Sequence, residues 1–366
     1  MTAVGTSVPS FSCAAQVLCR KTAGRTCWGR CPRVSVYTHT PVARSGAFEG
    51  SGGLAVGKVA FLFPGQGSAA IGMGEALAEA SSAARRVLDR LGELAPTVRQ
   101  LIHEGPREEL IRTSNAQPAI FAVDCAALAA LAERDIHPDV TAGHSLGEYA
   151  ALVGAGVLDF DDGLPLVLQR GEVMEQSAAA QPGTMMAILG SNPETVNALI
   201  AEWQQRGIIA NANDNAPGQI VISGSVETLQ AAAPAFRELG ARVMDLPVGG
   251  AFHSPLMAHG ERGFAAALEA APFRDGRVPV VSNYTAGLSQ TADEVRAALR
   301  PQITGQVRWR ESVDAMLAFG VDTFIEAGPG KVLSGLVQRC TRGQTVTILN
   351  VEDPASLEKA VAALHG

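Results

Sequence analysis

The sequence lacks long apolar stretches, and it has few aromatic side chains and few cysteines outside its first 57 residues. No run of about 18 uncharged apolar residues occurs, so we expect no transmembrane helix and no membrane partner. Beyond residue 57 only Cys125 and Cys340 remain, which argues against a disulfide framework and favours a reducing compartment. Aromatic residues make up 5% of the chain, but hydrophobic residues make up 47%, which is typical of a globular protein with a sizeable core.

Acidic residues are nearly absent from residues 1–57, which contain six basic residues, four cysteines and one acid, Glu49. This segment is rich in Ser, Thr, Ala and Arg and has no apolar periodicity, as in an organellar transit peptide; a misplaced start codon is the alternative. Its cysteine spacing matches no zinc pattern. We expect a disordered extension, and a cytoplasmic protein unless the segment is a transit peptide for a plastid or mitochondrion.

The rest of the chain is acidic. The net charge of −7 for the whole chain leaves about −12 on residues 58–366. An acidic surface binds nucleic acid poorly, so we expect no nucleic-acid partner.

Strands alternate with helices along most of this acidic part. The predicted strands lie at about 59–63, 141–143, 278–282 and 322–326, and the predicted helices at about 72–92, 116–134, from 146 onward, 161–178, 255–271 and 310–319. This alternation predicts an α/β fold with a doubly wound, mostly parallel sheet and a hydrolase-like core.

The pattern changes between residues 181 and 248. The predicted strands there lie at about 183–189, 208–213, 219–224 and 242–248, and the predicted helices at about 192–205 and 225–238. The order β-α-β-β-α-β is the ferredoxin-like arrangement. We therefore expect a ferredoxin-like subdomain at 181–248, inserted into a core made of 58–180 and 249–366.

The segment Gly143-His144-Ser145-Leu146-Gly147 fits the pattern G-x-S-x-G. A serine nucleophile needs its hydroxyl exposed on a sharp turn from strand to helix, and the flanking glycines let neighbouring backbone pass close by. The N–H of Leu146 would then point at a developing oxyanion, helped by the positive end of the helix. The predicted strand before Ser145 and the helix after it favour a nucleophile over a serine in an ordinary turn.

Serine is a weak nucleophile and needs a base. His253 is the best candidate, because it follows the last strand of the inserted subdomain and a Gly249-Gly250 turn and precedes a helix. Open α/β sheets bind ligands at the carboxyl ends of their strands. His103 and His137 lie in polar connecting segments, and the side chain of His144 should point away from the adjacent serine. A helix-capping role for His253 is the alternative.

At these residues the sequence resembles the malonyl-CoA:acyl carrier protein transacylases of fatty acid synthesis. The resemblance runs from about Lys58 to the C-terminus, through several motifs in one order. These motifs are Phe63-Pro64-Gly65-Gln66-Gly67-Ser68, Asn115-Ala116-Gln117-Pro118, Gly143-His144-Ser145-Leu146-Gly147-Glu148, Gln169-Arg170-Gly171, Asn213-Asp214-Asn215-Ala216-Pro217-Gly218-Gln219, Gly250-Ala251-Phe252-His253-Ser254 and Glu326-Ala327-Gly328-Pro329-Gly330-Lys331.

The resemblance implies a role for each matching position. Ser145 matches the serine that becomes acylated, and His253 matches the general base. Gln66 and the N–H of Leu146 match the oxyanion-hole donors. Arg170 matches the arginine that binds the malonyl carboxylate; its guanidinium can pair with that buried charge through two parallel hydrogen bonds, which lysine cannot do.

Further positions are implied around the substrate. Gln117 lines the site, and Asn213 and Asn215 lie in a loop near the coenzyme A entrance. Phe252 lies beside the malonyl α-carbon, where an aromatic residue in related polyketide acyltransferases accompanies malonyl rather than methylmalonyl. Gln302 lies where a backbone carbonyl orients the histidine.

One segment departs from the family. Before Arg308-Trp309 the family has Ser-Pro-Val or Asn-Pro-Val, whereas this chain has Gly305-Gln306-Val307. The missing proline loosens the loop beside the histidine, which weakens the assignment of Gln302.

The implied reaction is a ping-pong transfer through a malonyl-serine ester, with a serine–histidine dyad and no metal or bound cofactor. The implied partners are malonyl-CoA and acyl carrier protein, with the enzyme a monomer. Acyl carrier proteins are acidic, so basic residues near the site could steer docking. The candidates are Arg308, Arg310, Lys331 and Arg339.

Other functions fit less well. A polyketide acyltransferase remains the nearest alternative. An α/β serine hydrolase or thioesterase predicts a histidine near the C-terminus and has no use for Arg170. The segment 65–70 fits a dinucleotide-binding fingerprint, but no second strand ending in an acid follows it. An inactive binding protein would lack Ser145, His253 or Arg170.

Overall fold

A six-stranded sheet forms the centre of the part that the structure, a computed structural model, describes: residues 57–365. The extension predicted at 1–57 lies outside these residues except for Gly57. The strand order is β10-β9-β1-β2-β7-β8, and every pair is parallel except β7 with β8. The strands are β1 (Lys58–Phe63), β2 (Val140–Gly143), β7 (Val280–Val281), β8 (Leu288–Ser289), β9 (Val321–Ala327) and β10 (Thr347–Val351). The predicted α/β class is confirmed.

Successive residues of β1 face opposite sides of the sheet, and both sides are buried. Phe61 and Phe63 belong to one apolar cluster, whereas Ala60 and Leu62 belong to a second cluster around Trp309. Helices on both faces explain why the strand is apolar throughout. The helices in the first cluster are α1 (Glu75–Ala80), α2 (Ser82–Leu94), α3 (Pro96–Glu104), α4 (Arg107–Leu110), α5 (Thr113–Glu133), α6 (Gly147–Ala155), α7 (Phe160–Ala180), α10 (Ala258–Ala270), α11 (Ala292–Leu299) and α14 (Pro354–His365), and those in the second are α12 (Trp309–Ala318) and α13 (Val332–Cys340).

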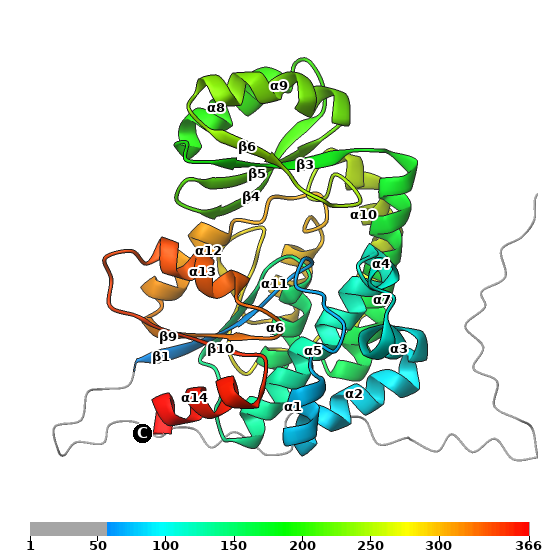
Figure 1. The fold of residues 1–366 in the computed structure, drawn as a ribbon, viewed down its shortest axis with the longest axis vertical. Coiled ribbons are helices and arrows are strands. Elements are labelled where there is room, and N and C mark those ends of the chain that lie inside the picture. Colours follow the sequence, from blue (N-terminus) through cyan, green and yellow to red (C-terminus); the bar gives the residue numbers. More distant parts are fainter. Residues whose placement is uncertain (1–56, 366) are drawn as a thin grey trace, which may run out of the picture. The chain divides into compact units, whose positions relative to one another are not determined.

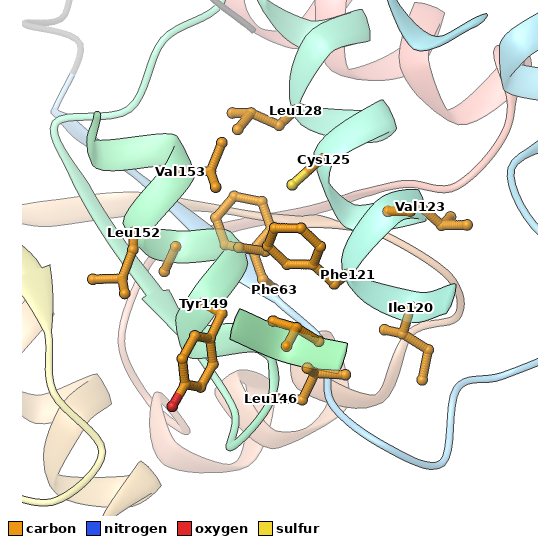
Figure 2. Close-up of a cluster of buried hydrophobic side chains, with 14 of the residues drawn as sticks. Phe63, Ile120, Phe121, Val123, Cys125, Leu128, Leu146, Tyr149, Leu152 and Val153 are labelled. Carbon is orange, nitrogen blue, oxygen red and sulfur yellow. The ribbon is translucent and has the colours of Figure 1, made fainter. Parts of the chain in front are cut away.

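The long helix α5 lies in the middle of the larger cluster. Figure 2 shows Phe63 and Phe121 meeting between α5 and α6. The Phe121 ring also stacks on Phe160 of α7, with centroids 5.6 Å apart. By length and composition α5 could cross a membrane, but 89% of its most apolar window is buried inside the protein. It is therefore a core helix.

A second sheet is built from the segment that follows α7. Its antiparallel strands lie in the order β4-β5-β3-β6, which is the ferredoxin-like order (Figure 1). One face packs on two helices through a separate apolar cluster around Ile220, Ile222 and Phe236. The opposite face turns Met185 and Val221 toward the core. The elements are β3 (Thr184–Leu189), α8 (Pro193–Trp203), β4 (Ile209–Ala216), β5 (Gln219–Gly224), α9 (Val226–Glu238) and β6 (Arg242–Asp245).

Some predicted boundaries are wrong. The predicted helix at 72–92 is two helices, because the Ser81 side chain accepts the N–H of Ala84 and caps α2. Strand β6 ends at Asp245 instead of 248, since Pro247 has no N–H for the ladder. The helix predicted from 255 begins with a 3-10 turn, Pro255–Met257. No elements were predicted at α3, α4, α11, α13, α14, β8 and β10.

Candidate active site

The turn between β2 and α6 presents Ser145 at the carboxyl edge of the main sheet. Its φ is 51°, in the left-handed region that costs a residue with a side chain about 1–2 kcal/mol. The flanking glycines permit this turn: a Cβ on Gly143 would lie 2.0 Å from the carbonyl of Gly147, and one on Gly147 would lie 2.0 Å from the carbonyl of Phe63. The crossing of these backbones therefore explains the glycine spacing.

His253 lies beside the serine. Its Nε2 atom is 2.8 Å from Ser145 Oγ, and its Nδ1 atom is 3.1 Å from the Gln302 carbonyl and 3.0 Å from the Gly305 carbonyl. Two carbonyls accept only if Nδ1 carries the proton, so Nε2 is the basic nitrogen. Burial, with the positive charge of Arg170, lowers the pKa of His253 to about 3. The imidazole is neutral at physiological pH.

His253 reaches the site from a different sheet than the prediction assumed. The strand before it, β6, is an edge strand of the small antiparallel sheet and does not belong to the parallel sheet. His253 therefore does not follow the carboxyl end of a strand in the parallel sheet. A loop from the subdomain carries His253 across, and its φ of 57° shows a second left-handed turn at the site.

Arg170 of α7 is fully buried, and every acceptor it contacts is neutral. Its guanidinium donates to Gln117 Oε1 at 2.7 Å and Gln302 Oε1 at 3.0 Å, and its Nη2 lies 3.1 Å from Ser145 Oγ. Its Nε has no hydrogen-bond partner, and no carboxylate within residues 57–365 forms an ion pair with it. Burial lowers the pKa of Arg170 below its usual range. A buried cation without a counterion is costly, so this arginine is suited to an anion brought by a ligand.

Glu148 is the nearest buried acid in this network. Its Oε2 accepts from Gln302 Nε2 at 2.7 Å, and its Oε1 accepts from the Asn283 N–H at 3.3 Å. Burial raises the pKa of Glu148 to about 7, although its hydrogen bonds and the charge of Arg170 act in the opposite direction. The carboxyl group is therefore only partly ionised near neutral pH.

A cavity of about 410 Å³ opens onto Ser145 and His253. Among the predicted site positions, Gln66, Phe252, Asn213 and Asn215 line it, together with Met185 and Val221 of the small sheet. Gln117, Arg170 and Gln302 are joined to Ser145 or to one another by the hydrogen bonds described above. The structure thus gathers these positions, which come from distant parts of the chain.

The backbone around the cavity offers free donors. Within residues 57–365, the N–H groups of Gln66 and Leu146 have no hydrogen-bond acceptor. The side chain of Gln66 is occupied, because its Nε2 donates to Thr113 Oγ1 at 3.1 Å. His144 points away from its neighbour and lies 2.8 Å from Asn215 Oδ1, and burial lowers the pKa of this histidine.

Sequence reasoning missed two parts of the site. The Gly305 carbonyl is a second acceptor for His253, in the loop that departs from the family. Asn283, which is buried, bonds both sides of the Ser145 turn. Its position directly after the strand predicted at 278–282 was a usable signal, because polar residues at that edge of a sheet often bind ligands.

The four basic residues suggested for docking all have partners. Arg308 pairs with Glu311, Arg310 with Asp214, Lys331 with Glu352, and Arg339 donates to Gln219. None of the four lines the cavity. In the described part of the chain, no group of three or more His, Cys, Asp or Glu side chains could hold a metal ion.

The profile of the acyl transferase domain matches residues 60–359, and the chain belongs to this family. The malonyl CoA-acyl carrier protein transacylase of Bacillus subtilis is 44% identical over 310 residues, which is 84% of this chain and 97% of that protein. The transacylase of the same name from Synechocystis is 39% identical over 282 residues, or 77% and 93% of the two chains.

Similar solved structures are also malonyltransferases. An acyl carrier protein S-malonyltransferase from Vibrio cholerae superposes with a TM-score of 0.79 at 37% identity, covering 83% of this chain and 99% of its own. A malonyl-transacylase in complex with a type II polyketide acyl carrier protein gives 0.80 at 36% identity, covering 84% and 99%. Within the acyl transferases, the chain is a member of the malonyl CoA-acyl carrier protein transacylase family, as the motifs predicted.

Proposed function

We propose that this enzyme transfers the malonyl group from malonyl-CoA to the phosphopantetheine thiol of an acyl carrier protein of fatty acid synthesis. The observation that carries the proposal is Arg170, a buried guanidinium without a counterion, 3.1 Å from Ser145 Oγ. A malonyl ester on that oxygen would bring a carboxylate within reach of the arginine. An acyl group without a carboxylate would leave the buried charge unpaired.

In the first half-reaction, Ser145 Oγ attacks the thioester carbonyl while its proton passes to His253 Nε2. The N–H groups of Leu146 and Gln66 suit the oxyanion, because neither has another acceptor within the described residues. The protonated histidine then gives its proton to the departing coenzyme A thiolate. The two carbonyls at Nδ1 take the place of a carboxylate in stabilising the imidazolium.

In the second half-reaction, the carrier protein thiol gives its proton to His253 and attacks the malonyl ester, and Ser145 leaves with that proton. The donor, malonyl-CoA, and the acceptor, acyl carrier protein, both carry phosphopantetheine, so one cavity can admit each in turn. Asn213 and Asn215 line this cavity and suit the amide groups of the pantetheine arm.

Three further side chains have supporting roles at the site. Gln117 and Gln302 orient Arg170, and Phe252 limits the space beside the malonyl α-carbon. We place the catalytic core at 58–180 and 249–366 and the ferredoxin-like subdomain at 181–248. We further propose a monomer that works in the cytoplasm, or in a plastid or mitochondrion if residues 1–57 act as a transit peptide.

Intact-protein mass spectrometry after brief mixing with malonyl-CoA tests the proposal, with Ser145→Ala as the control. The expected result is the gain of one malonyl group, its absence in the variant, and its transfer to added acyl carrier protein. Steady release of coenzyme A into water without an adduct would instead indicate a thioesterase. Comparing carrier proteins of fatty acid and polyketide synthesis as acceptors separates the two transferase alternatives.

A further inference from the structure

The turn that carries Ser145 is strained, so other groups must hold it in place. Ser145 and His253 both have left-handed backbones, at φ 51° and 57°. Such conformations persist in residues with side chains only where the surrounding structure determines them. The two glycines beside the serine permit the turn by leaving room, but they supply no bond that fixes it.

Asn283 supplies bonds on both sides of the turn. Its Oδ1 accepts the N–H of Ser145 at 2.6 Å, and its Nδ2 donates to the Gly143 carbonyl at 2.6 Å. The orientation of the amide is fixed, because an N–H can only donate and a carbonyl can only accept. One side chain therefore spans the last residue of β2 and the reactive serine.

The sheet brings this side chain into position. Strand β7 pairs with β2 in parallel, with Val281 opposite Ala142, so the chain leaving β7 runs beside the chain leaving β2. Asn283 is 1% exposed. Its own backbone is held as well, since its N–H donates to Glu148 and its carbonyl accepts from the N–H of Arg308 at 2.9 Å.

The other side of Ser145 is held by a second amide. Gln302 Nε2 donates to the Ser145 carbonyl at 2.9 Å and to Glu148 Oε2 at 2.7 Å. The N–H and the carbonyl of the serine are thus each bonded to an amide side chain, and both of these residues bond to Glu148. Any shift of Asn283 would move the serine backbone relative to His253 and Arg170.

We propose that Asn283 is a positioning residue for the nucleophile, because its side-chain amide fixes the Ser145 turn by bonding Gly143 and Ser145 together. This inference rests on the proposed role of Ser145 in the transfer. Asn283 does not line the cavity that would hold the acyl group and the leaving group. It acts only through the backbone of the serine.

Asn283→Asp is the informative variant, because the two side chains have nearly the same shape. The aspartate can accept the Ser145 N–H, but when ionised it cannot donate to the Gly143 carbonyl. Protonation restores a donor. Two titratable or charged residues among those described bond to Asn283: Glu148 of α6, and Arg308 before α12 through its backbone N–H. Arg170 and His253 are connected to it further away, because both bond to Gln302, which bonds to Glu148.

The assay is the rate at which a small alkyl fluorophosphonate labels Ser145, followed by intact mass. In this reaction the serine oxygen bonds to phosphorus, fluoride leaves, and the serine proton passes to His253. Labelling needs no malonyl group, so it tests the positioning of Ser145 even if the proposed substrate is wrong. Adduct formation from malonyl-CoA is measured separately and tests the substrate. Asn192→Asp is the control, because Asn192 is exposed and caps α8 through its Oδ1, a role that aspartate can also fill.

At pH 8 we expect Asn283→Asp to be labelled about 10- to 100-fold more slowly than the wild type. Without the hydrogen bond to the Gly143 carbonyl, Ser145 Oγ would lie less often in the reactive position beside His253. The ratio to wild type should recover several-fold at pH 5.5, and Asn192→Asp should match the wild type at both values. A folded Asn283→Asp that reacts at the wild-type rate, or that shows the same deficit at both pH values, would overturn the proposal.

Asn283→Ser provides a second test if the aspartate variant does not fold, because a serine hydroxyl is too short to bond both groups. A tenfold or larger loss of labelling with an unchanged melting temperature supports the proposal. Labelling at the wild-type rate overturns it.

Discussion

Replacing Arg170 with methionine should change which acyl group the enzyme accepts. Methionine keeps an unbranched, flexible side chain, although a shorter one, and removes the charge that we propose binds the malonyl carboxylate. A buried carboxylate that loses its partner costs about 3–5 kcal/mol, which corresponds to a fall of roughly 10²- to 10³-fold or more in kcat/KM for malonyl-CoA.

Acetyl-CoA has no carboxylate and serves as the internal reference. For this substrate the variant loses the contact of Arg170 with Ser145 Oγ at 3.1 Å, a single bond worth about 0.5–1.5 kcal/mol, or up to roughly tenfold. The preference for malonyl over acetyl should therefore fall by about 100-fold. Arg170→Lys keeps a point charge without the paired geometry and should lie between the wild type and the methionine variant.

Single-turnover acylation of Ser145, followed by quenching and intact mass, measures both substrates directly. Arg206→Met is the matched control, because Arg206 is 56% exposed and pairs with Glu202 on the surface of α8. It should leave both rates unchanged. Equal losses for malonyl-CoA and acetyl-CoA in Arg170→Met would refute the reasoning, since Arg170 would then serve only to hold Gln117 and Gln302.

Three further predictions concern His253, Glu148 and Phe252. The charge of Arg170 helps to lower the pKa of His253, and a bound malonyl carboxylate would offset that charge. The pKa of His253 should therefore be higher in the substrate complex than in the free enzyme, so in pH–rate profiles the acid limb of kcat should lie at higher pH than the acid limb of kcat/KM. Acid limbs at the same pH would contradict this. The pKa of Glu148 is raised from 4.5 to about 7, so between these pH values the folded protein holds a proton that the unfolded chain releases. The free energy of unfolding should therefore fall by on the order of 3 kcal/mol as the pH rises from below 4.5 to above 7. Glu148→Gln cannot ionise and so lacks this fall. In urea unfolding, the free energy of unfolding of the variant relative to wild type should therefore increase from pH 5 to pH 8. A difference between the two proteins that stays constant with pH would argue against the raised pKa. Finally, Phe252→Ala should narrow the preference for malonyl-CoA over methylmalonyl-CoA by about tenfold in competition assays, and an unchanged ratio would remove Phe252 from the specificity pocket.

The sharp turn at Ser145 was predictable because its signal is local. Gly143 and Gly147 are required by backbone contacts within one turn and one neighbouring strand, so the spacing itself encodes the turn at Ser145. The helix α11 also carried a readable signal that was overlooked: Thr291 and Glu294 form a capping box at its start.

The strand before Asn283 was a local signal for its place at the sheet edge, but the partners of its side chain could not be predicted in the same way. Its bonds depend on the pairing of β2 with β7, and Asn283 lies 138 positions from Ser145 in the sequence. His253 was found for a reason that the structure does not support, since β6 belongs to the small sheet. The resemblance to the family identified His253 where the strand argument could not, because a family motif records three-dimensional contacts that a single sequence does not show.

The arrangement of Arg170, Gln302 and Glu148 would keep the site ready for the anion that we propose it binds. A carboxylate in direct contact would neutralise the arginine but would also compete with the substrate for it. Here the Gln302 amide lies between them, accepting from Arg170 through Oε1 and donating to Glu148 through Nε2. Glu148 can therefore moderate the buried positive charge without occupying the guanidinium, and its raised pKa keeps that compensation incomplete near neutral pH. The remaining unbalanced charge favours an acyl group that brings its own carboxylate.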